Sequence, residues 1–415
     1  MSAPKPLAVI VLGATGVTGK QAVPYLRERS RELGFTWGIA GRSAPRLEAL
    51  VSQWPEAERP EVLLVDTENR DSIEAAVGRT AAVVNFAGPF ARMAPGVIEA
   101  AVEAGVAYVD VTGEIDFAAT IVDRWHERAV ETGARIVQVC GFESLPFDLL
   151  AAATLERHAE RYPDQSPIAI EVVFSGAPPA GRPYASDLVS NGTFESLREA
   201  LAGEGAHLLG DPAALVGDLT PAAGVRAASP ISSRPRWKSG VGPLAPMLPS
   251  PLINPPVIQR SLALAGRPPI RYREAIATAA MVPTAPLQAL VAGSASAFNG
   301  GLSLLARAPS GVRRGVSNAL KLVAPAGGPR EDRLAGWRWS VECEVVGSDG
   351  GVAQGRLEAE GHPGYLATSK MTSEAGLILA LAEAESPEIA GVLTPSSALG
   401  TAELDRFAAA GLRFS

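Results

Sequence analysis

The chain is poor in the residues that build disulfide frameworks and metal sites. Only two cysteines occur in 415 residues, and each lies in an apolar, strand-like run, so we expect two buried thiols in a reducing, cytoplasmic setting. The four histidines lack metal-ligand spacing, and we expect no bound metal. The net charge of −7 argues against nucleic acid as the main partner, because binding a phosphate backbone needs clustered Lys and Arg. No signal peptide is expected either, because a predicted strand begins close to the first residue.

The first 150 residues do show a regular alternation of strand-like and helix-like segments. Apolar, β-branched runs predict strands at 7–12, 36–40, 61–65, 82–86, 107–111 and 135–139. Helical periodicity predicts helices at 20–33, 46–53, 70–77, 96–104 and 121–132. Strands that alternate with helices form a parallel sheet covered on both faces. We therefore predict an α/β fold class whose N-terminal domain, residues 1–150, is a doubly wound Rossmann sheet.

The rest of the chain has a different pattern. We predict a second, α+β domain over residues 151–385 and a C-terminal tail over 386–415 that packs back on the body. A β-hairpin is expected at 337–346 and 352–361, which indicates a mainly antiparallel sheet. An amphipathic helix is expected after it, at 365–383.

Two stretches of the second domain have unusual compositions. Residues 212–256 hold ten prolines, which indicates a long irregular excursion or a partly disordered loop. Residues 275–306 carry no charge, and basic residues follow within the apolar segment 275–325. One interpretation is that this segment forms the internal wall of an acyl pocket or an interface between subunits; we expect a homodimer. The other is a peripheral contact with a membrane.

The most informative motif is VIVLGATGVTGK at residues 9–20. Gly13 permits a tight turn off the strand, Gly16 lets a phosphate approach the backbone, and Gly19 lets the helix pack on the strand. The N–H groups at the helix start then face an anion. The expected dinucleotide contacts in this loop are Gly13, Ala14, Thr15, Gly16, Val17 and Thr18. The alternative is a purely structural glycine turn.

The ends of the following strands indicate which dinucleotide binds. An NAD site usually places an acidic residue after the second strand, but here the run is AGRS. Arg42 can pair with a 2′-phosphate and Ser43 can donate a hydroxyl, which favours NADP(H) over NAD; the alternative is a solvated surface arginine. Asp66 is expected to contact the adenine. The small residues Ala87, Gly88 and Pro89 are expected to approach the pyrophosphate and the nicotinamide ribose, beside Asn85.

Five motifs occur in a familiar order: GATGVTG, AGRS, NFAGPF, YVDVTGE and VCGFESLPFD. Together they resemble the saccharopine-dehydrogenase-like oxidoreductases, and within them the trans-acting enoyl reductases of actinobacterial lipid synthesis. Further matches are NGTxxS from Asn191, GYxxT from Gly364 and GVLTPxxALG from Gly391, so the resemblance covers nearly the whole chain except the Pro-rich middle. Two residues depart from the family pattern, Glu143 in place of a common Asp and Asn85 in place of Thr or Val.

The resemblance implies hydride transfer from NADPH between a nucleotide-binding domain and an α+β domain. For the enoyl reductase branch it implies an α,β-unsaturated acyl chain on a carrier protein, supplied by a polyketide synthase that lacks its own reductase. Two alternatives stay open. One is a saccharopine-type amino-acid oxidoreductase, against which the second domain has little clustered Arg. The other is a non-catalytic nucleotide-binding or membrane-associated scaffold.

Enoyl reduction needs a donor for the enolate oxygen and a proton for the α-carbon. Tyr108 and Glu114 lie near the end of the fifth predicted strand and are candidates for the proton donor. The Asn191-Gly-Thr193 turn heads a helical stretch, so Thr193 is a candidate for the enolate site; an ordinary helix cap is the alternative. Buried acids at the joint between two domains more often accept hydrogen bonds from backbone N–H groups than take part in catalysis.

Overall fold

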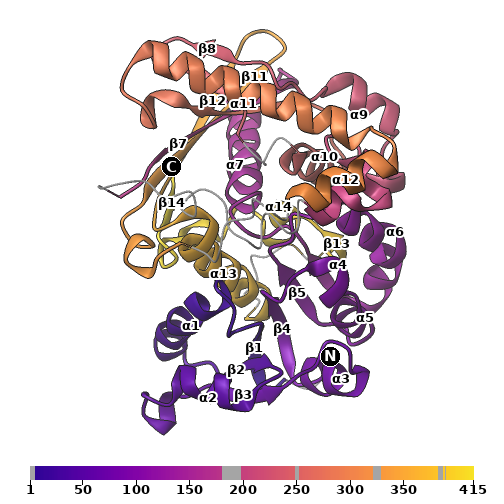
Figure 1. Cartoon of the computed structure of the whole chain (residues 1–415), viewed down its shortest axis with the longest axis vertical. Coiled ribbons are helices and arrows are strands. Elements are labelled where there is room, and N and C mark those ends of the chain that lie inside the picture. The colour runs from indigo at the N-terminus through magenta and orange to yellow at the C-terminus, as the bar shows by residue number, and fades with distance from the viewer. Residues whose placement is uncertain (1–4, 180–197, 248–251, 321–328, 382–386, 388) are drawn as a thin grey trace. The chain divides into compact units, whose positions relative to one another are not determined.

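The computed structural model describes residues 5–179, 198–247, 252–320, 329–381, 387 and 389–415 (Figure 1). These residues form two compact units. The first comprises residues 1–112, 120–142 and 363–411, and the second comprises 113–119, 143–362 and 412–415. The expected domains were 1–150, 151–385 and 386–415. The units differ from those bounds because the chain returns to the first unit at residue 363.

The first unit is built on a seven-stranded sheet in the order β13-β6-β5-β4-β1-β2-β3. Every neighbouring pair is parallel. The strands are β1 (Leu7–Leu12), β2 (Trp37–Gly41), β3 (Glu61–Leu64), β4 (Thr80–Asn85), β5 (Ala107–Asp110), β6 (Arg135–Val137) and β13 (Gly391–Leu393). Six of them are the strands expected from the alternation, and the seventh comes from the C-terminal tail. The strand order reverses between β1 and β4, which is where a doubly wound sheet binds its ligand.

The crossover helices of this unit begin and end at local signals. Asn69 caps α3 (Arg70–Val77) by accepting the N–H of Ser72, and Gly34 ends α1 (Gly19–Leu33) at a φ of 72°. The other helices in this part of the chain are α2 (Ala44–Val51), α4 (Phe90–Met93), α5 (Pro95–Glu103), α6 (Ile115–Thr132) and α14 (Pro395–Leu399). The first turn of α6 belongs to the second unit.

Helix α13 (Thr368–Ala380) corrects the expectation of an amphipathic helix. Every described residue from Thr368 to Leu379, apart from Lys370, is buried, including Ser373 and Glu374. The helix packs on β4, β5 and α1 of the first unit (Figure 1). Its polar side chains are therefore not a solvated face; for example, the Thr372 hydroxyl donates to the carbonyl of Cys140 at 2.8 Å.

The second unit contains a seven-stranded sheet in the order β14-β12-β11-β7-β10-β9-β8. All its neighbours are antiparallel except β10 and β7, so the predicted fold class is confirmed. The strands are β7 (Pro167–Ala177), β8 (Arg236–Lys238), β9 (Gly242–Ala245), β10 (Arg271–Ala277), β11 (Arg338–Gly347), β12 (Val352–Glu360) and β14 (Leu412–Phe414). The expected hairpin is β11 and β12, whose residues alternate between buried and exposed positions.

Helix α7 (Leu145–Arg161) covers the β11–β12 hairpin. The approach is close because Gly355 has no side chain: a Cβ there would clash with the hydroxyl of Thr154. Cys343 lies under the same helix, and both cysteines are buried free thiols, as the sequence predicted.

The Pro-rich residues 212–256 are less irregular than expected. The described part contains α9 (Ala222–Ala228), β8, β9 and the first residues of α10 (Asn254–Leu264). The short strands β8 and β9 form one end of the second sheet, and β9, which contains Pro243, pairs with both β8 and β10. Tertiary pairing therefore orders a segment whose composition indicated a loop.

The uncharged stretch ends in a surface helix, α11 (Ala285–Ala306), followed by α12 (Ser310–Leu320). Helix α11 packs on β9 and α12, and Ala292, Asn299, Leu302 and Ala306 are its buried residues. Its large apolar side chains are mostly exposed, Leu290 at 64% and Leu304 at 73%. This exposure is opposite to the expected internal wall of a pocket, and leaves a subunit interface or a membrane as the partner of the helix.

Candidate nucleotide site and a second polar cluster

The loop between β1 and α1 has the geometry expected of a phosphate-binding turn. Gly13 has a φ of +77°, and a Cβ there would lie 2.7 Å from the backbone nitrogen of Ala87, so only glycine fits. A Cβ on Gly19 would clash with the carbonyl oxygen of Gly13. Among the described residues, no acceptor binds the N–H groups of Thr15, Val17 and Thr18, and the first turn of α1 holds no acidic residue. The turn therefore offers free donors to an anion.

The loop after β4 is held by a chain of buried polar groups. The Oδ1 atom of Asn85 accepts the N–H of Ala87 at 2.8 Å, and its Nδ2 atom donates to the Tyr108 hydroxyl at 2.8 Å. The Tyr108 hydroxyl donates in turn to Asp110 at 2.9 Å. Asn85, Tyr108 and Asp110 are fully buried, while Gly88 is exposed next to them. Asn85 thus positions the Ala87-Gly88-Pro89 turn beside the β1 loop.

The third part of the site lies at the ends of β2 and β3, on the other side of β1. Arg42 is exposed directly after β2, and Ser43 precedes α2 without using its side chain as a cap. Asp66 follows β3, and its Oδ1 atom accepts the N–H of Glu68 at 3.1 Å, so one of its oxygens is engaged in a local turn. The carboxyl ends of neighbouring parallel strands meet at one edge, so these residues share the edge that carries the glycine turn. A positive, exposed end of β2 without an acid fits a 2′-phosphate.

The three candidates for catalysis are placed very differently. The Tyr108 hydroxyl already binds Asn85 and Asp110 in the first unit. Glu114 belongs to the second unit and is 2% exposed. Thr193 lies outside the described residues, as do Asn191 and Gly192. Their roles in catalysis stay predictions.

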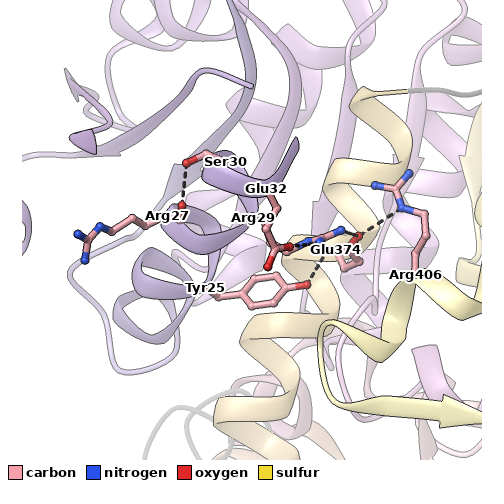
Figure 2. Close-up of polar contacts among 7 residues, drawn as sticks. All are labelled: Tyr25, Arg27, Arg29, Ser30, Glu32, Glu374 and Arg406. Carbon is pink, nitrogen blue, oxygen red and sulfur yellow. Dashed lines mark hydrogen bonds and ion pairs between the residues drawn. The ribbon is translucent and has the colours of Figure 1, made fainter. Parts of the chain in front are cut away.

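A buried carboxylate on α13 binds two side chains of helix α1, as Figure 2 shows. Glu374 of α13 accepts the Tyr25 hydroxyl at 2.6 Å and the Arg29 guanidinium at 3.0 and 3.1 Å. Arg406 adds a third donor at 3.3 Å. Burial and the neighbouring Glu374 carboxylate raise the pKa of Tyr25 above its ordinary value. The cluster ties α1 to α13, and so fixes the direction in which the N-terminus of α1 points.

Another acid, Glu274 of the second unit, has an enclosed carboxylate and was missed in the sequence. Its Oε2 atom accepts the Asn254 amide at 2.7 Å and the Tyr272 hydroxyl at 2.8 Å, while its buried Oε1 atom has no partner. Among the described residues no cation pairs with it, and burial raises its pKa to about 7. Glu274 and Tyr272 line a small pocket together with Arg234 and Arg236. The sequence signal was that Glu274 is the one acid between residues 219 and 330.

Comparison with known proteins agrees with this geometry. The family model of the saccharopine dehydrogenase NADP-binding domain matches residues 9–138. A Mycobacterium tuberculosis protein, named provisionally as a trans-acting enoyl reductase, is 31% identical over 99% of this chain and 97% of its own length. A Mycobacterium ulcerans protein named trans-acting enoyl reductase is 28% identical over 99% of this chain and 98% of its own.

Among solved structures, the apo saccharopine dehydrogenase (L-Glu forming) of Saccharomyces cerevisiae superposes with a TM-score of 0.52. The match covers 98% of this chain and 99% of the other at 11% identity, and it shows the fold alone. The family model confirms NADP(H) as the cofactor, and the glycine turn, the free N–H groups and Arg42 fit that dinucleotide. The protein is an NADP-dependent oxidoreductase.

Proposed function

Because this chain belongs to the family of trans-acting enoyl reductases, we propose that it reduces the C=C bond of an α,β-unsaturated acyl thioester. The thioester is carried by a polyketide synthase that acts separately from this protein. The observation that supports the NADPH half of the proposal is the nucleotide site at the β1–β4 reversal, with Arg42 in place of an acid.

The reaction adds one hydride to the β-carbon and one proton to the α-carbon of the thioester. The dinucleotide, when bound, supplies the hydride. The protein must then stabilise the negative charge that develops on the thioester oxygen and deliver the proton. We propose Thr193 for the first task and Glu114 or Tyr108 for the second. The Tyr108 hydroxyl donates to Asp110 in the described structure, and Glu114 is 2% exposed.

Turnover with a soluble thioester tests this function. The purified protein is mixed with NADPH that carries deuterium at the transferred position and with a 2-enoyl pantetheine thioester. The expected product is a saturated thioester with one deuterium at the β-carbon, detected by mass spectrometry. NADPH binding without turnover of enoyl thioesters would contradict the proposal. Oxidation of an amino acid with NADP⁺ in place of enoyl reduction would indicate saccharopine-type chemistry.

Two variants separate the proton donors. If Glu114 donates, Glu114→Gln lowers kcat by about a hundredfold or more, while Tyr108→Phe changes it far less. NADPH affinity, measured on both variants, serves as the control for an intact nucleotide site. Unchanged kcat in Glu114→Gln would remove this residue from the mechanism.

A further inference from the structure

Charge is distributed very unevenly along this chain. Residues 219–330 contain thirteen Lys and Arg and a single acid, Glu274, which makes this segment +12. The whole chain is −7, so the remaining residues sum to −19. Several of these cations are paired with acids outside the segment, such as Arg226 with Asp211 and Lys238 with Glu344. Arg307, Arg313 and Arg314, however, have no acidic partner among the described residues.

The same segment carries the most apolar surface helix described. Leu287, Leu290, Phe298 and Leu304 recur at helical spacing along α11, and their exposed fractions are 41%, 64%, 57% and 73%. The helix has no charged residue in 22 positions, and the stripe from Leu287 to Leu304 is about 26 Å long at 1.5 Å per residue. In the most apolar stretch of this helix, only 22% of the residues are buried. Exposed apolar surface of this extent marks a binding surface.

Cationic and aromatic side chains lie on the elements next to α11. Arg307 follows α11 directly, and Arg313 and Arg314 lie on α12, which packs on α11. The Arg313 guanidinium donates to the carbonyls of Leu201 and Gly203, which holds α12 in place without cancelling its charge. Trp237, 72% exposed, lies on β8, next to the β9 strand that packs on α11. In Figure 1, α11 extends along the edge of the unit beside β8.

We propose that the outer face of α11, with Arg307, Arg314 and Trp237 at its border, docks on an anionic lipid membrane surface. The helix lies along the surface and does not cross it, because its opposite face is buried on β9 and α12. The apolar stripe enters the acyl boundary, the arginines contact lipid phosphates, and the tryptophan lies at the headgroup level. A second copy is disfavoured as the occupant because it would present the same positively charged segment at the contact.

Vesicle binding by the full-length protein tests the proposal. The probes are phosphatidylcholine vesicles with and without phosphatidylglycerol, at low and at high salt. We expect co-sedimentation with the anionic vesicles, weakened by salt, and a loss of about tenfold or more in the double variant Leu290→Glu/Phe298→Glu. The double variant Arg307→Gln/Arg314→Gln should lose the preference for the anionic vesicles. Equal binding of the wild type and the acidic double variant would overturn the proposal.

The control variant is Leu64→Glu, which replaces an equally exposed leucine of the first unit and should leave vesicle binding unchanged. NADPH affinity and turnover of a soluble enoyl thioester should be the same in all variants, so a failure here is separate from a failure of the proposed function. Dimers that dissociate in Leu290→Glu/Phe298→Glu, without vesicle binding by the wild type, would overturn the proposal in favour of a second copy. Loss of carrier-protein binding in that variant, again without vesicle binding, would overturn it in favour of an acidic protein.

Discussion

Each unit holds a glutamate whose carboxylate is enclosed on a helix or strand, Glu374 on α13 and Glu274 on β10, and the two have different partners. Glu374 of the first unit faces Tyr25 and two guanidinium groups, Arg29 and Arg406. Glu274 of the second unit faces only neutral donors, Tyr272 and Asn254. A carboxylate beside guanidinium groups is a structural charge, whereas a carboxyl among neutral groups responds to pH near neutrality. The comparison shows that burial alone does not define the role of an acid; the charge of its neighbours does.

The largest effect should come from breaking the cluster around Glu374. Glu374→Gln removes the fully buried carboxylate that the half-buried Arg29 and Arg406 share, although each keeps a more exposed acidic partner, and we expect it to lower the free energy of unfolding by about 3–5 kcal/mol in urea denaturation. The matched control is Glu32→Gln, because Glu32 also pairs with Arg29 but is 59% exposed; its loss should stay within about 1 kcal/mol. Similar losses in both variants would contradict a special role for the buried partner.

The second largest effect is the pH dependence caused by Glu274. Its pKa is about 7 in the folded protein and 4.5 as the ordinary value, so the unfolded chain loses this proton first. Stability is therefore reduced as pH rises from about 4.5 through 7, and above 7 the cost is about 3 kcal/mol. Glu274→Gln should remove this decline, which thermal unfolding at pH 5 and at pH 8 can measure. A parallel decline in the wild type and the variant would assign it to other groups.

The third effect is smaller and concerns the nucleotide site of the first unit, which neither glutamate contacts. Arg42→Ala should weaken NADPH binding about 10- to 100-fold and leave NADH binding nearly unchanged, because only NADPH carries the 2′-phosphate. Titration calorimetry measures both affinities. Arg31→Ala, which removes an exposed arginine from the far end of α1, is the control and should bind both nucleotides as the wild type does. Equal weakening of NADH and NADPH in Arg42→Ala would contradict a phosphate contact.

The smallest effect concerns the hydrogen bond from Tyr272 to Glu274. Tyr272→Phe removes one of the two donors that favour the ionised carboxylate, so the pKa of Glu274 should rise further. We expect a loss of about 1 kcal/mol at pH 8 and a shift of the pH transition to higher values. Thermal unfolding across pH detects both. Tyr162→Phe, at a partly exposed tyrosine of the same unit, should leave the transition where it is. A downward shift in Tyr272→Phe would mean that the hydroxyl does not bind the charged form.

Local pattern was enough to predict the first sheet and the cofactor loop. The expected strand at 7–12 and helix at 70–77 have the observed bounds, because each is a short apolar or periodic run between clear turn signals. The glycine turn was equally readable, although only Gly19 lies against a residue close in the chain, Gly13, whereas Gly13 lies against the backbone of Ala87. NADP(H) followed from the missing acid at Arg42.

Other parts of the molecule could not be predicted from local pattern. An amphipathic helix was expected at 365–383, yet α13 is buried because it packs on β4, β5 and α1, where its Glu374 pairs with Arg29 and Arg406. The prolines of 212–256 indicated a loop, although pairing with β10 orders part of the segment. The apolar composition of α11 could indicate an internal wall as well as a surface.

The sequence by itself determined the doubly wound sheet, the nucleotide turn and the cofactor class, because these depend on residues close together in the chain. Only the tertiary structure decided that 363–411 completes the first unit, that Glu374 is paired and Glu274 is not, and that the stripe on α11 faces outward. The physical reason is that burial and charge pairing depend on contacts between residues that are distant in sequence. For Arg29 and Glu374 that separation is 345 residues.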